Sequence, residues 1–328
     1  MSLFCKTPTF WGKRNFFSYL LAPIGYLYQQ GTYFRQFIKK PYKIPIPVIC
    51  VGNINVGGVG KTPLSIAIAE HLIEQCFSPH FITRGYGRKI QGNFRVGRYN
   101  NSKGVGDESL LLSKIAPVWV ATSRVNAALL ALEQGATHLI LDDGFQDPSL
   151  FKDLSLCVVD GQIGFGNGFG LPAGPLRENV QDGLKRADAL CIMGNMTQDI
   201  QKKLVDPLPI FEMNLIIDVP EILKDKKLIA FAGIGYPEKF FQSLKNEGLN
   251  VIYTFSYPDH YEYTLNDLQI MYDRAKDEGA TLVTTEKDFA RFENRYFEEK
   301  NDTIVPIKAR INIKQDAQFK EMLNKVLS

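Results

Sequence analysis

The sequence has no acidic residue near its start and little cysteine or histidine anywhere. No aspartate or glutamate precedes Glu70, yet the 328 residues carry a net charge of only +3. The five cysteines include no CxxC pair, and the four histidines are too few and too dispersed for a zinc site. We therefore expect no disulfide framework and no structural metal. A net charge this small also gives no reason to expect nucleic acid as a partner.

Long apolar runs are also missing. Residues 15–34 lack charge over twenty positions but contain one asparagine, one serine and two glutamines. This composition makes a membrane-spanning helix a weak interpretation. This stretch contains Pro23 and Gly25 and is not followed by a small-residue cleavage site, so a secretory signal peptide is not expected either.

The opening segment is rich in positive charge and aromatic rings. Residues 1–45 hold seven cations, no anion and twelve aromatic side chains. Rings mixed with cations suit a helix that lies at an anionic bilayer surface, so we expect interfacial attachment. The alternative is an amphipathic helix packed on the protein's own core.

Strand and helix patterns alternate along the rest of the chain, and its length suggests two domains. We expect an N-terminal helical segment over 1–45, a nucleotide-binding domain over 46–205 and a second α/β domain over 206–328. A composition break lies near 195–225, between the two α/β domains. Strands are predicted at 46–51, 79–84, 118–121, 138–141, 156–159, 189–193, 227–233, 249–255 and 281–284, and helices at 63–72, 107–115, 123–134, 237–247 and 265–278.

A glycine-rich loop lies between the first predicted strand and the helix at 63–72. Strand, glycine loop and helix form the setting of a nucleotide site, because loop amides and the helix N-terminus point at phosphate oxygens. Lys61 is expected to reach the β- and γ-phosphates and the Thr62 hydroxyl to bind Mg²⁺. The residues predicted to bind the nucleotide are Asn55, Val56, Gly57, Gly58, Val59, Gly60, Lys61 and Thr62.

Residues 138–143 predict an apolar strand that ends in two carboxylates. A phosphate-bound Mg²⁺ needs an acidic partner opposite the loop threonine, and Asp142 is placed for that role. Alone, such a strand end is more often a cap or a turn, but the upstream Lys-Thr pair favours the metal. Together the patterns predict ATP, Mg²⁺ and a P-loop NTPase-type, doubly wound, mostly parallel α/β sheet, with a second, smaller α/β domain and an N-terminal amphipathic membrane-binding helix.

Other charged residues have two interpretations each. Asp107 and Glu108 begin a predicted helix, as a plain cap or as a kinase carboxylate that accepts a hydroxyl proton. Arg84, Arg124 and Arg177 are candidates for contacting anionic phosphate, although a lone arginine more often forms a surface ion pair.

Two clusters of the second domain are equally open. His260, in an expected turn, is more often a capping or surface residue than a catalytic one. Residues 284–288 end a predicted strand with a dense group of charges. Neither pattern decides a role by itself.

Eight blocks along the chain resemble the tetraacyldisaccharide 4'-kinase family, the lipid A 4'-kinases of Gram-negative bacteria. The ordered set is highly specific and covers nearly the whole chain. The blocks are VGNINVGGVGKTP (51–63), RGYGR (84–88), GDE (106–108), DDGFQD (142–147), LPAGPLRE (171–178), AGIGYPEKF (232–240), PDHYEY (258–263) and TEKDFA (285–290).

The resemblance implies transfer of the ATP γ-phosphate to the 4'-hydroxyl of a tetraacylated glucosamine disaccharide 1-phosphate. The family works at the cytoplasmic face of the inner membrane, with two α/β domains and an N-terminal hydrophobic helix that meets the membrane. The acylated lipid and the anionic membrane surface are therefore the expected partners. No protein partner is inferable, which leaves a monomer as the expectation.

The resemblance also implies roles for residues. Asp107 becomes the general base with Glu108 as its acidic neighbour, and His260 hydrogen-bonds to Asp107 from the second domain. Asp142 and Asp143 organise Mg²⁺ and the catalytic Lys61. The residues implied to contact the substrate are Arg84, Tyr86, Arg124, Gln146 and Arg177.

Two residues depart from the family pattern. Asn55 stands where serine or threonine is usual. Asp147 stands where histidine normally follows DDGFQ, which puts any role of that histidine in doubt.

Two other functions fit parts of the same pattern. A membrane-associated ATPase switch with a deviant glycine loop also joins a basic helix to a nucleotide domain, but Val56 replaces the signature lysine of that loop. A nucleotide-binding lipid-transport adaptor would make the GDE and DHY blocks structural. Dependence of ATP use on a lipid acceptor separates both from a kinase.

Overall fold

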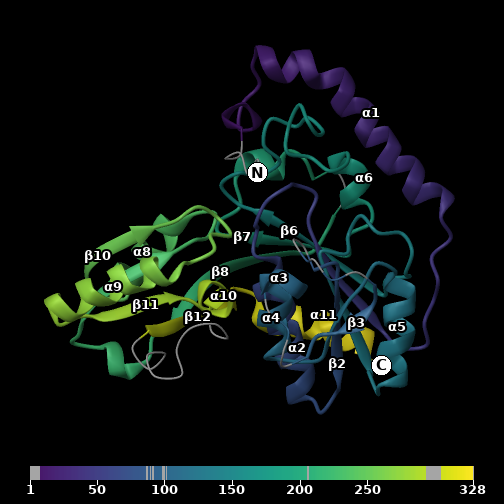
Figure 1. Cartoon of the computed structure of the whole chain (residues 1–328). Coiled ribbons are helices and arrows are strands. Elements are labelled where there is room, and N and C mark those ends of the chain that lie inside the picture. The colour runs from purple at the N-terminus through teal and green to yellow at the C-terminus, as the bar shows by residue number, and fades with distance from the viewer. Residues whose placement is uncertain are drawn as a thin grey trace.

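The computed structural model describes residues 8–85, 88, 90, 92–97, 100, 102–204, 207–292 and 304–327. Within them, twelve strands form one sheet in the order β10-β9-β11-β12-β8-β7-β6-β1-β5-β2-β4-β3 (Figure 1). Neighbouring strands are parallel except in the pairs β3–β4 and β8–β12. The strands are β1 (Val48–Gly52), β2 (Pro79–Thr83), β3 (Phe94–Arg95), β4 (Val118–Val120), β5 (His138–Asp142), β6 (Leu154–Asp160), β7 (Ala189–Met193), β8 (Ile210–Asp218), β9 (Lys227–Ala232), β10 (Asn250–Ser256), β11 (Thr281–Thr285) and β12 (Ile304–Ile313).

Helices cover both faces of this sheet, as in a doubly wound fold. The first half of the molecule is built on strands β1 to β7. Helices α2, α4 and, from the end of the chain, α11 contribute to one of its hydrophobic cores, and α5, α6 and α7 contribute to the other. In the second half, built on β9 to β12, α8 and α9 pack on opposite faces of β9. The helices are η1 (Thr9–Trp11), α1 (Phe16–Ile38), α2 (Lys61–Glu74), α3 (Ser102–Val105), α4 (Asp107–Ser113), α5 (Arg124–Glu133), α6 (Val180–Leu184), α7 (Gln198–Gln201), η2 (Glu221–Leu223), α8 (Pro237–Asn246), α9 (Leu265–Glu278), α10 (Glu286–Phe292) and α11 (Asp316–Leu327).

The central strands read as unbroken apolar runs because both faces of the sheet are covered. Every residue of β1, β5 and β6 is buried. Since β1, β5, β6 and β7 are parallel, their carboxyl ends meet at one edge. That edge carries the glycine loop after β1, Asp142 and Asp143 at the end of β5, and the glycine- and proline-rich loop 161–177 after β6. The candidate site lies there.

Strand β8 occupies the predicted composition break and pairs with β7 on one side and β12 on the other. Its side chains are buried at 211 and 213 but exposed at 215 and 216, so it lacks the continuous apolar run of the central strands. Helix α11 lies against the first half of the molecule (Figure 1). Its Phe319 and Leu323 are buried in the core of that half. The sheet is thus continuous through the predicted boundary at 205/206, and the division into 46–205 and 206–328 remains a prediction.

Helix α1 forms within the predicted N-terminal segment and lies along the outside of the first half (Figure 1). An amphipathic character is not confirmed. Phe16, Phe17, Tyr19 and Leu20 are all well exposed, and their spacing places them on different sides of the helix. Within α1 only Ser18 and Gly25 are buried, so the helix does not bury an apolar face on the core. No helix in the described ranges is long and apolar enough to span a membrane.

The described cysteines lie in two different environments. Cys50, Cys157 and Cys191 are buried in strands, whereas Cys76 is exposed and Cys5 lies outside the described residues. Burial raises the pKa of the Cys191 thiol to about 12 and keeps it in the protonated, unreactive form.

Candidate active site

The glycine loop bends sharply from β1 into α2. Gly57 and Gly60 have φ angles of 124° and 87°, which favour glycine, and Gly60 caps the helix. A Cβ at Gly60 would lie 2.3 Å from Met193 Cε, the movable end of a flexible side chain, so the positive φ is the main reason for glycine there. Lys61 folds back over the loop, with Nζ 3.4 Å from the Gly57 carbonyl. A Cβ at Gly57 or Gly58 would meet nothing within 4 Å, so this part of the loop borders open space just before α2.

The first two loop residues attach the loop to segment 161–177. The Asn55 side chain is buried and donates to the Gly164 carbonyl at 2.7 Å. The Val56 amide donates to the Pro175 carbonyl at 2.8 Å. Asn55 thus fixes the loop to its neighbour, and the Val59 side chain faces the core.

Asp142 and Thr62 meet as the sequence predicts. The Thr62 hydroxyl donates to Asp142 Oδ2 at 3.2 Å, and the Ser65 hydroxyl donates to Oδ1 at 2.9 Å. Burial and, next to it, the Glu108 charge raise the pKa of Asp142 to about 7, against the opposing effect of Lys61. A carboxylate this buried favours a nearby cation.

Asp143 lies between two cations. Lys61 Nζ is 3.7 Å from Oδ1, and Arg177 Nη1 contacts both carboxylate oxygens at 2.9 and 3.1 Å. Burial acts to raise the pKa of Asp143, but Lys61 and Arg177 outweigh it, and the pKa lies below its ordinary value. The carboxylate of Asp143 therefore contacts both Lys61 and Arg177.

Gln146 extends this network away from the loop. Its amide donates to the Asn53 carbonyl at 2.6 Å and to Glu178 Oε1 at 2.9 Å, and its oxygen accepts from Arg177 at 3.3 Å. Helix α1 also reaches the network, since Arg35 donates to the Gln146 carbonyl at 3.2 Å.

Arg84 and Arg124, two more of the predicted substrate residues, lie at the same edge of the sheet. Buried Arg124 pairs with Asp147 at 2.5 Å and donates to the Asp143 carbonyl at 2.8 Å. Arg84 is mostly exposed and lies 3.3 Å from the same Asp147 carboxylate. Asp147, which replaces the family's usual histidine, thus orients two arginines. Tyr86 lies outside the described residues.

The two halves of the chain meet at Asp107. His260 Nδ1 lies 2.9 Å from Asp107 Oδ2, and Arg291 Nε donates to the same oxygen at 2.8 Å. Burial acts to raise the pKa of Asp107, but hydrogen bonds from His260 and Arg291 and the Arg291 charge lower it to about 2. The predicted contact between Asp107 and His260 is present. Glu108 faces Lys287 of the second half at 3.6 Å.

Sequence reasoning missed Ser65, Glu178 and Arg291. Ser65 lies one helical turn after Lys61 on the face that meets Asp142, so helical spacing held a signal for it. Arg291 directly follows the TEKDFA block, and only tertiary packing brings it to Asp107. Within the described residues no three metal-binding side chains cluster, and Asp142 and Thr62 are the pair placed for a phosphate-bound ion.

A glycine loop that caps a helix, with a lysine held against a carboxylate, is typical of the class of P-loop nucleotide-binding proteins. Comparison with known proteins narrows this class. The family model for tetraacyldisaccharide-1-P 4'-kinase matches residues 17–328, so the chain belongs to this family and is an ATP-dependent kinase.

Known relatives agree with this assignment. A tetraacyldisaccharide 4'-kinase of Paramagnetospirillum magneticum is 45% identical over 87% of this chain and 89% of its own length. One from Jannaschia sp. is 39% identical over 98% of this chain and 99% of its own. A crystal structure of LpxK from Aquifex aeolicus in complex with ATP is 30% identical, with a TM-score of 0.77 over 95% of this chain and 99% of that one.

Proposed function

We propose that this chain transfers the γ-phosphoryl group of ATP to the 4'-hydroxyl of tetraacyl-glucosamine disaccharide 1-phosphate and so forms the 4'-phosphorylated lipid A precursor. The observation that carries the proposal is the 2.9 Å contact between His260 Nδ1 and Asp107 Oδ2. It joins a carboxylate suited to accept a hydroxyl proton with an imidazole from the other half of the chain. A simple ATPase switch has no acceptor hydroxyl to deprotonate, so this pair is not expected in one.

The phosphate side of the reaction falls to the glycine loop and Lys61. The loop amides and the start of α2 would hold the β- and γ-phosphates, and Lys61 would move between Asp143 and the γ-phosphoryl oxygens. Thr62 and Asp142 offer the oxygen ligands that Mg²⁺ prefers, and the raised pKa of Asp142 fits a carboxylate that a cation would stabilise. Bound there, Mg²⁺ would neutralise charge on the phosphate oxygens.

The acceptor side falls to Asp107 and the arginine network. The 4'-oxygen would form a bond to the γ-phosphorus as the bond to the ADP oxygen breaks, and Asp107 would take the hydroxyl proton. Arg177, Arg124 and Gln146 would orient the sugar and its phosphate, because their side chains gather around Asp143 and Asp147. We further propose that 46–205 and 206–328 act as two units that close on the substrate, with the dyad complete in the closed form.

We expect ATP use to depend on the lipid acceptor. The full chain with ATP, Mg²⁺ and the disaccharide 1-phosphate in mixed micelles should form one ADP for each 4'-phosphorylated product. Omitting the acceptor should lower ADP formation by at least about tenfold, because Asp107 then has no hydroxyl to deprotonate. Product mass and ADP are measured together. Full ATP turnover without acceptor would instead support the ATPase switch.

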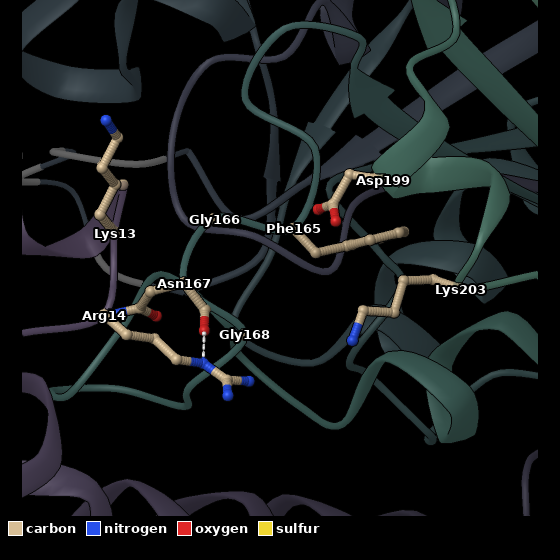
Figure 2. Close-up of a pocket in the computed structure, with 9 residues that line it drawn as sticks. Lys13, Arg14, Phe165, Gly166, Asn167, Gly168, Asp199 and Lys203 are labelled. Atoms are coloured by element: carbon tan, nitrogen blue, oxygen red, sulfur yellow. Dashed lines mark hydrogen bonds between the residues drawn. The ribbon is translucent and has the colours of Figure 1, made fainter.

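We also propose that α1 binds the anionic cytoplasmic surface of the inner membrane, where the lipid substrate lies. Its large side chains are exposed along its length, from Phe16 at 74% to Ile38 at 78%. A hollow of about 290 Å³ opens beside the start of this helix (Figure 2). Its lining includes Lys13, Arg14 and Lys203 with one acid, Asp199. A positive hollow next to exposed apolar side chains suits an anionic lipid surface.

The membrane proposal predicts that charge on α1 releases the protein from vesicles. Leu20 and Leu27 are 62% and 68% exposed, so changing both to glutamate should spare the fold and weaken binding by about tenfold or more. Co-sedimentation with vesicles of phosphatidylglycerol and phosphatidylcholine measures this. Glutamate at Ile222 and Ile270, which are 63% and 52% exposed in the second half, is the matched control. Equal sedimentation of the two double variants would refute the proposal.

A further inference from the structure

Arg291 is a buried cation that crosses from the second half of the chain to the candidate base. It lies on α10, its side chain is 4% exposed, and its Nε donates to Asp107 Oδ2 at 2.8 Å. Helix α10 packs directly against α4, which begins at Asp107. This contact joins the same two halves as the contact of His260.

The other end of the guanidinium is fixed within the second half. Arg291 Nη1 donates to Asp288 Oδ1 at 2.6 Å and to the Gly233 carbonyl at 2.7 Å. Asp288 is fully buried and also accepts from the Tyr263 hydroxyl at 3.0 Å and the Thr285 hydroxyl at 2.7 Å. A planar guanidinium held at two atoms has little freedom to turn. Arg291 is therefore a rigid arm that presents Nε to Asp107.

Gly233 permits this arrangement because it has no side chain. A Cβ there would lie 3.2 Å from Arg291 Nη1, 3.2 Å from Asp288 Oδ1 and 3.0 Å from the Tyr263 hydroxyl. Any larger residue would push against all three groups. The AGIGYPEKF and TEKDFA blocks, whose roles the sequence left open, thus meet at one buried network.

Both contacts to Asp107 use the same carboxylate oxygen. His260 Nδ1 and Arg291 Nε lie at 2.9 and 2.8 Å from Oδ2. We infer that Arg291 is a positioning residue for the phosphoryl transfer, and that it and His260 occupy Oδ2 so that Oδ1 receives the proton of the acceptor hydroxyl. The inference rests on the proposed function. In the transfer, the 4'-oxygen bonds to the γ-phosphorus, the bond to the ADP oxygen breaks, and the hydroxyl proton passes to Oδ1.

Arg291 also keeps the Asp107 carboxylate ionised before it accepts the proton. Its cation opposes the effect of burial and helps to keep the pKa of Asp107 near 2, so the carboxylate is ionised at any pH where the enzyme works. Without that cation the pKa of Asp107 rises, and activity that needs the ionised form falls off at a higher pH than in the wild type. The charged or titratable groups that contact Asp107 are His260 and Arg291. Asp259 lies beside His260, Asp288 and Tyr263 form the network behind Arg291, and the neighbouring Glu108 faces Lys287.

The test compares Arg291→Gln and Arg291→Lys across pH. Glutamine removes the charge, so we expect kcat to fall by about 10²-fold, the acidic limb of the kcat profile to move to higher pH, and the KM for ATP to stay within about twofold. Lysine keeps the charge but not the two-ended geometry. We expect it to restore the position of the acidic limb while kcat stays about tenfold low. Arg274→Gln, at an exposed ion pair with Glu278 on α9, is the matched control.

The outcomes separate this inference from the proposed function. If the wild type forms no 4'-phosphorylated product, the kinase proposal fails, whatever the variants do. If the wild type is active and Arg291→Gln keeps its kcat and its acidic limb, the positioning role is overturned. That role is also overturned if kcat falls but the limb stays in place for both variants, since a merely structural arginine would give that result. Nucleotide binding by each variant, measured by calorimetry, shows that the fold is intact.

Discussion

Replacing Lys61 by alanine should lower kcat for phosphoryl transfer by about 10³-fold, the largest effect expected from any single change in this protein. The Lys61 side chain is only 10% exposed, and its Nζ lies 3.7 Å from Asp143 Oδ1 and 3.4 Å from the Gly57 carbonyl. A buried cation at this place stabilises negative charge on the γ-phosphoryl oxygens as it develops, and water in its place does so poorly. ATP affinity should also weaken, because the same cation contacts the bound phosphates.

Steady-state kinetics with calorimetric ATP binding measures both losses. Lys224→Ala is the control, since Lys224 is 58% exposed and forms a surface pair with Glu221. It should change neither quantity by more than about twofold. Near-wild-type transfer by Lys61→Ala would exclude the loop as the phosphate site, and the kinase mechanism with it.

The second large effect concerns Asp107 and His260 together. Each alanine variant should lower kcat by about 10²-fold or more while ATP affinity stays nearly unchanged, because neither residue lies on the glycine loop. The double variant should be little worse than Asp107→Ala alone, since an imidazole that acts through the carboxylate has nothing to act on once it is gone. The two halves must meet for this coupling, so it also reports on closure.

A double-mutant cycle on kcat/KM gives the coupling directly. His71→Ala is the matched histidine control, because His71 on α2 contacts Gln75 and Asn324 far from the site. If the losses of Asp107→Ala and His260→Ala add fully, His260 works independently of Asp107 and the dyad is wrong.

The sequence determined the first half of the molecule well. The predicted strands over 46–193 form as β1, β2, β4, β5, β6 and β7, with ends within a few residues of the prediction. They were predictable because both faces of the sheet are covered, which leaves unbroken apolar runs in the sequence. The glycine loop and Asp142 were predictable for a related reason. Consecutive elements of a parallel sheet bring their carboxyl ends to one edge, so local pattern and topology agree.

The second half was predicted less completely. Strands β9, β10 and β11 and helices α8 and α9 form as expected, whereas β8, β12, α10 and α11 were missed. Strand β8 is exposed on its later residues, and α11 depends on the first half's core for its burial. Elements that pack on distant parts of the chain carry only a weak local signal.

By itself, the sequence determined the fold class, the glycine loop, the contact of its threonine with Asp142 and the family to which the chain belongs. Tertiary structure alone decided that Asn55 fixes the loop to segment 161–177, that Asp147 orients two arginines, and that Arg291 meets Asp107. The reason is physical. Asp107 and Arg291 are brought together by the reversal of strand direction between β8 and β12 and by the packing of α10 on α4, and no local pattern encodes a contact between residues so far apart in the chain.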